Sequence, residues 1–412
     1  MKLLDFANSG LRSACVVAAV WVPLIGNADE YHYQNILIGE RAAGLAGAYT
    51  AISDSPAGLF YNPSGIVYAA SGNVSASVNA YHVGNKSYKR GLSGLSDWDR
   101  ESSSFVPNFF GVIQPLGKGS IGFSYAVPDS IIEDQDLEFT DTPSGISKYI
   151  INFDNRDRTY NIGPSYAMEL RDGLSVGATL YVHYRERQWI SNQIATLTSG
   201  AYQWINTYFQ TKEYGLRPIL GVMWSPLEKM SIGASISKTM LLNSATDSQV
   251  TTKGASTTAL ARTSSTTDIK RVHPLTTVVG VAYFPTKALL LSLDISANSS
   301  TEDALFGNKE LTVNIAGGAE YYLSSAWVLR GGLYTNNANT PEVSNTSMGQ
   351  PEHIDYVGSA ASVSHFMRNS SITLGVNYSM GDGKGQIVGG SNEVQDIEAY
   401  SYTMFLSTAY SF

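Results

Sequence analysis

Residues 371–380 read Ser-Ile-Thr-Leu-Gly-Val-Asn-Tyr-Ser-Met, and this stretch decides the fold class. Every second residue from Ile372 to Met380 is apolar, and the residues between them are small or polar. Because successive side chains of a β-strand point to opposite faces, the stretch predicts a strand with one apolar and one polar face. Residues 174–185 and 230–237 repeat the pattern. The apolar face would meet a core in a soluble sandwich and lipid in a membrane barrel, so the alternation alone leaves both open.

The connections between the alternating segments favour the membrane barrel. About fourteen such segments follow one another after residue 70. Tight turns, as at residues 171–172, alternate with long connections, the longest near residues 129–157, 191–209 and 241–270. Short turns at one rim and long loops at the other are typical of bacterial outer-membrane barrels. We therefore predict an all-β fold, a transmembrane antiparallel β-barrel of about 14 strands.

The ends of the predicted strands carry aromatic residues, which we expect at the two membrane surfaces. The chain also finishes on an alternating strand whose last residue is Phe412, which suits export to an outer membrane. The predicted surface aromatics are Trp189, Trp224, Phe284, Tyr321 and Trp327.

The N-terminus has the three parts of an export signal. Lys2 and Arg12 are basic, residues 14–25 are apolar, and small residues precede Asp29. We predict a signal peptide over residues 1–28. The only cysteine, Cys15, lies within it, so the mature protein is predicted to lack disulfides and thiolate metal sites.

Residues 29–69 lie between the signal peptide and the barrel of residues 70–412 and show no alternation. A barrel of this size is too wide to be filled by its own side chains alone. The segment is rich in small residues, and prolines and glycines force turns in it. We therefore predict that residues 29–69 form a plug, or hatch, inside the lumen.

The order of residues 39–66, GERAAGLAGAYTAISDSPAGLFYNPSGI, resembles the N-terminal hatch of the FadL/TodX family of outer-membrane transporters for hydrophobic compounds. Asn62-Pro63-Ser64-Gly65, preceded by Phe60-Tyr61, matches the family's Asn-Pro-Ala-Gly motif. Hairpins along the chain are also similar, so the resemblance covers nearly the whole mature protein. It implies passive uptake of long-chain fatty acids or aromatic hydrocarbons, which bind against the hatch and leave sideways beside a kinked third strand. In this sequence Gly122 and Pro128 are the candidates for that lateral gap.

Two further groups of residues are candidates for ligand contact. The predicted loop 191–209 carries apolar side chains near one helical stripe, and an exposed stripe of this kind predicts capture of a hydrophobic compound. These capture residues are Tyr202, Trp204, Ile205, Tyr208 and Phe209. The loop 241–270 is rich in Ser and Thr instead, which departs from the family pattern. Arg185, Arg217 and Arg330 face the lumen by alternation, where each could hold a carboxylate headgroup or serve in a structural ion pair.

The formal net charge of −8 argues against a nucleic-acid partner. The six histidines are scattered without ligand spacing, so we predict no catalytic residues, metal or cofactor, and no enzymatic activity. The expected partners are hydrophobic small molecules and outer-membrane lipid, with the protein a monomer in the bacterial outer membrane. Two alternatives stay open. One is a structural or scaffold barrel that anchors or shuttles exported proteins, and the other is a general porin.

Overall fold

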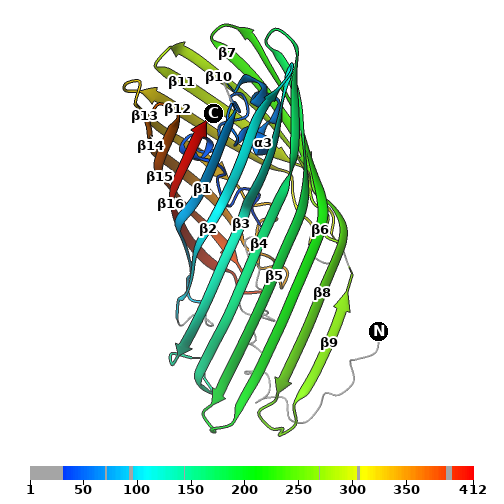
Figure 1. The fold of residues 1–412 in the computed structure, drawn as a ribbon. Coiled ribbons are helices and arrows are strands. Elements are labelled where there is room, and N and C mark those ends of the chain that lie inside the picture. Colours follow the sequence, from blue (N-terminus) through cyan, green and yellow to red (C-terminus); the bar gives the residue numbers. More distant parts are fainter. Residues whose placement is uncertain are drawn as a thin grey trace.

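A single antiparallel sheet that closes on itself forms the wall of the protein (Figure 1). The structure is a computed structural model, and it describes residues 31–69, 72–91, 96–142, 144–268, 270–303, 307–386 and 392–412. The predicted signal peptide, residues 1–28, lies outside the described residues.

Short helices come first along the described chain, and strands make up most of the rest. The helices are α2 (Glu40–Gly44), α3 (Gly58–Tyr61) and the 3-10 helix η2 (Pro63–Tyr68). The strands are β1 (Asn73–Tyr88), β2 (Trp98–Leu116), β3 (Gly119–Phe139), β4 (Ile146–Arg171), β5 (Leu174–Leu197), β6 (Tyr202–Leu227), β7 (Met230–Lys238), β8 (Met240–Lys253), β9 (Ala261–Thr267), β10 (Leu275–Thr286), β11 (Leu289–Asn298), β12 (Thr312–Tyr322), β13 (Trp327–Asn336), β14 (His353–Phe366), β15 (Ser370–Gly385) and β16 (Gln395–Ser411). No helix in the described part of the chain has the length and apolar content needed to cross a membrane.

The ring of strands consists of β1–β7 and β10–β16. Each strand pairs antiparallel with its neighbours, and β5 pairs with β6 from Leu174↔Trp224 to Thr196↔Tyr202, which closes the ring. Strands β8 and β9 lie outside the ring. β8 pairs with the N-terminal half of β6, from Trp204 to Leu216, and β9 pairs with β8. The described residues thus form a closed barrel of 14 strands, as the sequence predicted.

The two rims of the barrel differ as expected, but the strands are longer than predicted. We call the rim with the tight turns the turn end and the opposite rim the loop end. Three predicted loops are wrong: residues 129–157 and 191–209 are mostly the ends of β3–β6, and residues 241–270 contain most of β8 and all of β9. Figure 1 shows these strands continuing past their neighbours at the loop end as a tall wall on one side.

A reversal of polarity along the strands explains the error. On β4, the outer face carries Ile162 and Tyr166 in the half near the turn end but Asp154 and Arg156 in the half near the loop end. The inner face changes in the opposite sense, and Phe153 is buried there. Strand segments with a polar outer face resemble loops in composition, although their alternation continues.

The outer face carries a membrane-sized apolar band. Tyr125, Tyr160, Tyr184 and Tyr214 form a row across β3–β6, with neighbouring ring centroids 6.2, 6.0 and 5.0 Å apart. Trp224 lies ten positions along β6 from Tyr214 on the same face. At about 3.3 Å per residue and a tilt of about 45°, ten residues span about 23 Å of membrane. This height matches the apolar band of about 25 Å in outer-membrane barrels.

Three of the five predicted surface aromatics, Trp224, Tyr321 and Trp327, are exposed. The prediction was wrong for Trp189, which is buried because β5 continues past it to Leu197. It was also wrong for Phe284, which packs against buried side chains of the lumen.

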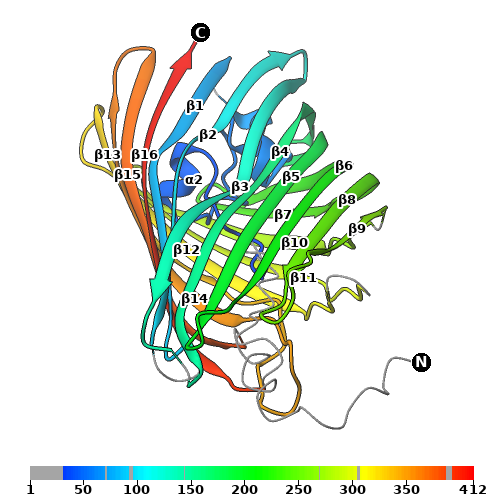
Figure 2. The same cartoon turned by 90° about the horizontal axis from the view of Figure 1, so that it is seen from below.

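Residues 31–69, which we call the luminal segment, lie inside the ring of strands (Figure 2). Their apolar side chains are buried, and η2 contacts β4, β5 and β6. Two wall glycines permit this close approach. A Cβ added to Gly221 would lie 2.0 Å from Asn62 Oδ1, and one added to Gly233 would lie 2.2 Å from the carbonyl oxygen of Thr50.

Candidate functional site

Asn62 joins the luminal segment to itself and to the barrel wall. Its side-chain amide donates to the carbonyl oxygens of Thr50, at 2.8 Å, and of Val222 on β6, at 3.1 Å. Its Oδ1 accepts from the backbone amide and the hydroxyl of Ser64. Pro63, which lacks an N–H, starts η2. The contiguous motif that the sequence singled out therefore shapes the turn between α3 and η2 and anchors it to β6.

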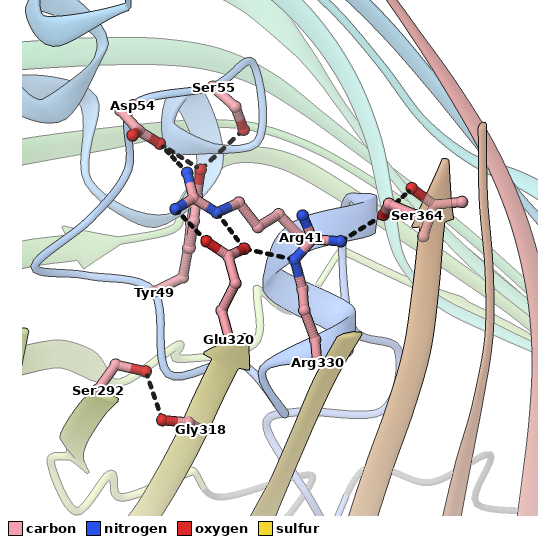
Figure 3. A network of polar contacts seen from close by, with 10 residues as sticks. Arg41, Tyr49, Asp54, Ser55, Ser292, Gly318, Glu320, Arg330 and Ser364 are labelled. Carbon is pink, nitrogen blue, oxygen red and sulfur yellow. Dashed lines mark hydrogen bonds and ion pairs between the residues drawn. The ribbon is translucent and has the colours of Figure 1, made fainter. Parts of the chain in front are cut away.

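A second anchor is an ion-pair network between the luminal segment and β12 and β13 (Figure 3). Arg41 donates to both oxygens of Glu320, each at 2.8 Å, and lies 2.6 Å from Asp54. Arg330 Nε donates to the same Glu320, whose side chain is fully buried. Burial alone would lower the pKa of Arg41, but the carboxylates of Asp54 and Glu320 raise it well above the ordinary value. Arg330, a predicted headgroup residue, is thus engaged in a structural ion pair.

A cavity of about 280 Å³ lies between the luminal segment and the strands β5–β7, β10 and β11. Its apolar lining comes from Ile36, Phe60 and Tyr61 of the luminal segment and from Ile219 of β6. Its polar lining comes from both sides: the luminal segment contributes His32, Gln34, Asn35 and Thr50, and the charged and imidazole groups of the barrel wall are Asp129, His183, Arg185, Arg217, Lys238, Arg271, His273 and Asp294. The aromatic groups of the luminal segment therefore face a wall that carries more cations than acids.

Most of these cations already have acidic partners. Arg185 Nε donates to Asp157 at 2.8 Å, and its Nη1 lies 3.7 Å from Glu213. Arg271 Nη2 lies 3.0 Å from Glu213. A buried arginine held by buried carboxylates is a structural element of the lumen. Arg185, another predicted headgroup residue, is therefore also occupied.

Arg217 differs from the other arginines of the cavity. Its guanidinium lies over the ring of Phe60, 4.9 Å from the centroid. Within the described residues it has no carboxylate at salt-bridge distance and donates no hydrogen bond. Of the three predicted headgroup arginines, it alone lines the cavity without an acidic partner.

Sequence reasoning missed a cluster on the same wall. The rings of His183 and His273 lie edge to face with centroids 5.6 Å apart, and their nitrogens are within 4.8 Å of a Glu213 oxygen. These residues are far apart in the chain, and only the pairing of β5 with β6 and the approach to β10 bring them together. Glu213 is already bridged by two arginines. The Nε2 of His183, which is 3% exposed, has no hydrogen-bond partner in the described chain.

The pairing of β2 with β3 covers only part of their length. It runs from Leu116↔Gly119 to Phe109↔Ala126 and stops there within these described strands, although β3 continues to Phe139 beside β4. A shift of register between Ala126 and Asp129 in the β3–β4 pairing marks the same place. We call the unpaired stretch the β2–β3 gap.

The two predicted gap residues behave differently. Gly122 is paired on both sides, with Ile113 and Ser165, so the prediction that it interrupts the ladder is wrong. Its missing Cβ instead makes room for Leu59 of the luminal segment, whose Cδ2 would lie 2.4 Å from it. Pro128 lies inside the register shift, where its lack of an N–H removes a ladder hydrogen bond.

The luminal segment enters the β2–β3 gap. The amide of Ile36 donates to the carbonyl oxygen of Pro128 at 3.2 Å, and the side chain of Asn108 on β2 donates to the carbonyl oxygen of Leu37 at 3.1 Å. The side chain of Asn35 donates to Asp129 on β3. Residues 35–37 therefore bridge β2 and β3 along the stretch where these two strands do not pair with each other.

The predicted capture residues do not form one stripe. Tyr202, Trp204, Ile205, Tyr208 and Phe209 all lie in β6, so the prediction of a loop with helical spacing is wrong. Strand alternation puts Tyr202, Trp204 and Tyr208 on one face and Ile205 and Phe209 on the other. An apolar spacing of three and four residues in a short run does not distinguish a helix from a strand with apolar residues on both faces.

Buried apolar side chains gather instead at the loop end, on the inner face. We call this group the mouth cluster, and it draws on β1, β2, β4, β5, β14 and β16. Its members are Tyr88, Trp98, Ile146, Tyr149, Ile151, Phe153, Ala195, Ile354, Tyr356, Ile397 and Ala399. Arg100 lies over Trp98 and Phe153 and pairs with Glu133 at 2.7 Å. The members come from six strands, so no local pattern in the sequence identifies them.

No protein-family model and no curated protein matches this sequence. Solved structures are similar in fold. A Pseudomonas aeruginosa FadL homologue matches with a TM-score of 0.64 and 12% identity over 92% of this chain and 100% of its own. The Pseudomonas putida toluene transporter TodX matches with a TM-score of 0.65 and 12% identity over 93% and 99%. The monoaromatic hydrocarbon channel CymD matches with a TM-score of 0.61 and 13% identity over 92% and 99%.

Proposed function

We propose that this chain, which has the barrel fold of the FadL and TodX transporters, carries hydrophobic small molecules across a bacterial outer membrane down their concentration gradient. The solved structures of similar fold include a toluene transporter and a hydrocarbon channel. The observation that carries the proposal is the cavity lined by Phe60 and Tyr61, inside a barrel whose bore holds the luminal segment. In this proposal residues 31–69 act as the plug.

The physical reason for such a site is the transfer energy of the cargo. Each buried CH₂ group gains roughly 0.8 kcal/mol when it leaves water, so an open aqueous channel offers little to a hydrocarbon. In this proposal the buried side chains of the mouth cluster move apart to admit the cargo at the loop end, and the cavity offers an apolar lining deeper in the barrel. Successive apolar sites let the cargo advance without returning to water.

The β2–β3 gap supplies the way out in this proposal. A paired ladder resists opening, because each separated residue exposes backbone groups that lipid cannot satisfy. Just beyond Phe109 and Ala126, hydrogen bonds made by residues 35–37 replace the ladder, and nearer the loop end the Arg100–Glu133 ion pair joins the two strands again. Moving these residues aside would free a lateral passage at the cost of a few hydrogen bonds. Pro128 maintains this gap, since it prevents β3 from completing the ladder.

Purified protein in liposomes tests the function against its alternatives. We expect saturable binding of toluene or a fatty acid, together with low ionic conductance and little swelling in sugar solutions. Free passage of sugars without hydrocarbon binding would instead establish a general porin. Co-purification with an exported protein, with neither activity, would establish a scaffold barrel. Either of the last two results overturns the proposal.

A further inference from the structure

We propose that the cavity selects compact hydrophobic carboxylates, whose single negative charge is bound by Arg217. The inference rests on the proposed function, because it names the substrate class of the same site. Three observations carry it: the unpaired charge of Arg217, the geometry in which Phe60 holds it, and the size of the cavity.

Two cations of the cavity lining, Arg217 and the exposed Lys238, have no ion pair among the described residues, and Arg217 is the one held against an aromatic ring. Arg185 is held by Asp157 and Arg271 by Glu213, so each of these arginines is compensated. Arg217 has no such partner among the described residues, although it lies in the lumen between apolar and aromatic groups. A charge removed from bulk water is costly unless it is paired. An incoming monoanion would supply the missing partner.

Neither acid of the cavity lining is paired with Arg217: Asp129 accepts from the side chain of Asn35, and Asp294 is held by the luminal segment. Asp294 accepts from the backbone amides of Tyr49 and Thr50 at 3.0 and 2.8 Å, so one of its oxygens is directed to the luminal segment. No ion pair joins Asp294 to an arginine within the described chain. The acid therefore anchors the segment and leaves Arg217 available to a ligand.

The geometry around Arg217 suits a carboxylate. With one face of the guanidinium over Phe60, its N–H groups point along the plane of the group, where a carboxylate binds through two parallel hydrogen bonds. The buried His183, whose Nε2 lacks a hydrogen-bond partner in the described chain, lines the same cavity. Its Nδ1 contacts Asn161 Oδ1 at 3.2 Å. Because Nδ1 donates its proton to that oxygen, Nε2 is an acceptor, so the donors for the carboxylate come from Arg217.

The size of the cavity limits the hydrophobic part of the ligand. A cavity of about 150 Å³ is enough for benzene, whereas sites for drug-sized ligands measure roughly 300–1,000 Å³. The value of about 280 Å³ lies between them. It fits a carboxylate on one aromatic ring or a short chain, with the apolar body against Phe60, Tyr61 and Ile219.

Three probes of matched shape test the inference on the full-length protein. Ethylbenzene has no polar group, 4-ethylbenzamide has a neutral one, and 4-ethylbenzoate has a carboxylate. Their binding is measured by calorimetry in a non-ionic detergent, with empty micelles as the reference. We expect the carboxylate to bind about 10- to 100-fold more tightly than the amide, which is the usual strength of a charge-assisted hydrogen bond. Arg217→Met should remove this preference, so that the carboxylate and the amide bind about equally.

Two further variants make the result specific. Arg217→Lys keeps the charge but not the planar pair of donors, so it should retain part of the preference. Arg262→Met removes one positive charge in the exposed β8–β9 hairpin, and we expect the wild-type preference. Heat-dependent mobility on a gel confirms that each barrel is folded.

The outcomes separate this inference from the proposed function. If Arg217→Met binds the carboxylate as tightly as the wild type, the inference is overturned, and the proposed function stands as long as ethylbenzene binds. If the wild-type protein binds none of the three probes, both are overturned. If it binds the carboxylate through Arg217 but not ethylbenzene, the anion site is supported and hydrocarbon transport is not.

Discussion

Glu320 shows how one buried carboxylate can hold a whole segment in place. It lies between Arg41 of the luminal segment and Arg330 of the wall, and its side chain is fully buried. Removing one member of a buried ion pair costs about 3–5 kcal/mol, because the partner is left uncompensated. Here removal of the acid would leave two arginines facing each other.

We therefore expect Glu320→Gln to loosen residues 40–55. A loss of about 3 kcal/mol corresponds to roughly 100-fold faster local opening. Hydrogen exchange followed by mass spectrometry should show this increase in α2 and the following turn, with no change in β15 and β16. Glu310→Gln, at an exposed position, is the matched control and should exchange like the wild type. Equal exchange in both variants would show that the network does not anchor the segment.

The residues of the candidate site were predictable only where they are contiguous. Asn62-Pro63-Ser64-Gly65 stands in one run and makes its contacts within a few residues and to β6. The three arginines, in contrast, have the same inward alternation. What separates Arg217 from Arg185 and Arg330 is the position of Asp157, Glu213 and Glu320 in neighbouring strands. Strand register decides which acids lie opposite each arginine, and the register cannot be deduced from a single sequence.

At the scale of elements, the alternation predicted the strands in the lipid band but not their continuations at the loop end. In the band, an apolar outer face and a polar inner face make the period obvious. Beyond the tyrosine row the outer face of β4 becomes polar while Phe153 is buried on its inner face, and β8 is rich in Ser, Thr and Asp after Leu242, so the pattern seen in the band is lost. The sequence predicted the position of the β2–β3 gap but not the residues that occupy it. Pro128 signals an interruption, whereas the entry of residues 35–37 depends on packing inside the lumen.

Locking the luminal segment into the β2–β3 gap should stop lateral release. The side chains of Asn35 and Asp129 meet at their tips, with Nδ2 and Oδ1 3.2 Å apart, so cysteines at both positions can be joined by a short reducible thiol cross-linker. We expect the cross-linked Asn35→Cys/Asp129→Cys protein to bind cargo but to transfer it into the membrane at least about tenfold more slowly, with recovery after reduction. Transfer of a fluorescent fatty acid from the protein to vesicles measures the rate.

A cross-link within a permanent ladder is the control for this experiment. Asn73 and Ser411 are register partners in β1 and β16, and their side chains are 3.3 Å apart. The same cross-link between cysteines at these two positions should leave transfer unchanged. Undiminished transfer through the cross-linked Asn35→Cys/Asp129→Cys protein would rule out the gap as the exit.

At the scale of the whole molecule, a wide ring of strands is combined with a luminal segment that fills its bore. Fourteen strands enclose more space than their inward side chains fill, and the wall is adapted to the segment by the absence of side chains at Gly221 and Gly233. The wall and the luminal segment are therefore complementary in shape.

Removal of residues 31–69 should turn the plugged barrel into an open pore. We expect the variant to pass sugars into liposomes and to conduct ions at least about tenfold better than the full chain. It should also lose hydrocarbon binding, since Phe60 and Tyr61 line the cavity. Gel mobility before and after heating shows whether the barrel has formed. A folded variant with unchanged conductance would contradict the assignment of the segment as the plug.

The reversal of polarity along β4 has a further consequence, which concerns immersion depth. If the loop end moved into the membrane, Arg156 and Asp154 would enter the hydrocarbon, where a charge costs up to about 2–4 kcal/mol near the midplane. If the barrel moved in the opposite direction, Ile162 and Tyr166 would be exposed to water. Both displacements therefore cost free energy. The barrel is therefore held at one depth, and the β2–β3 gap, which begins next to Tyr125 of the tyrosine row, stays level with the edge of the apolar band.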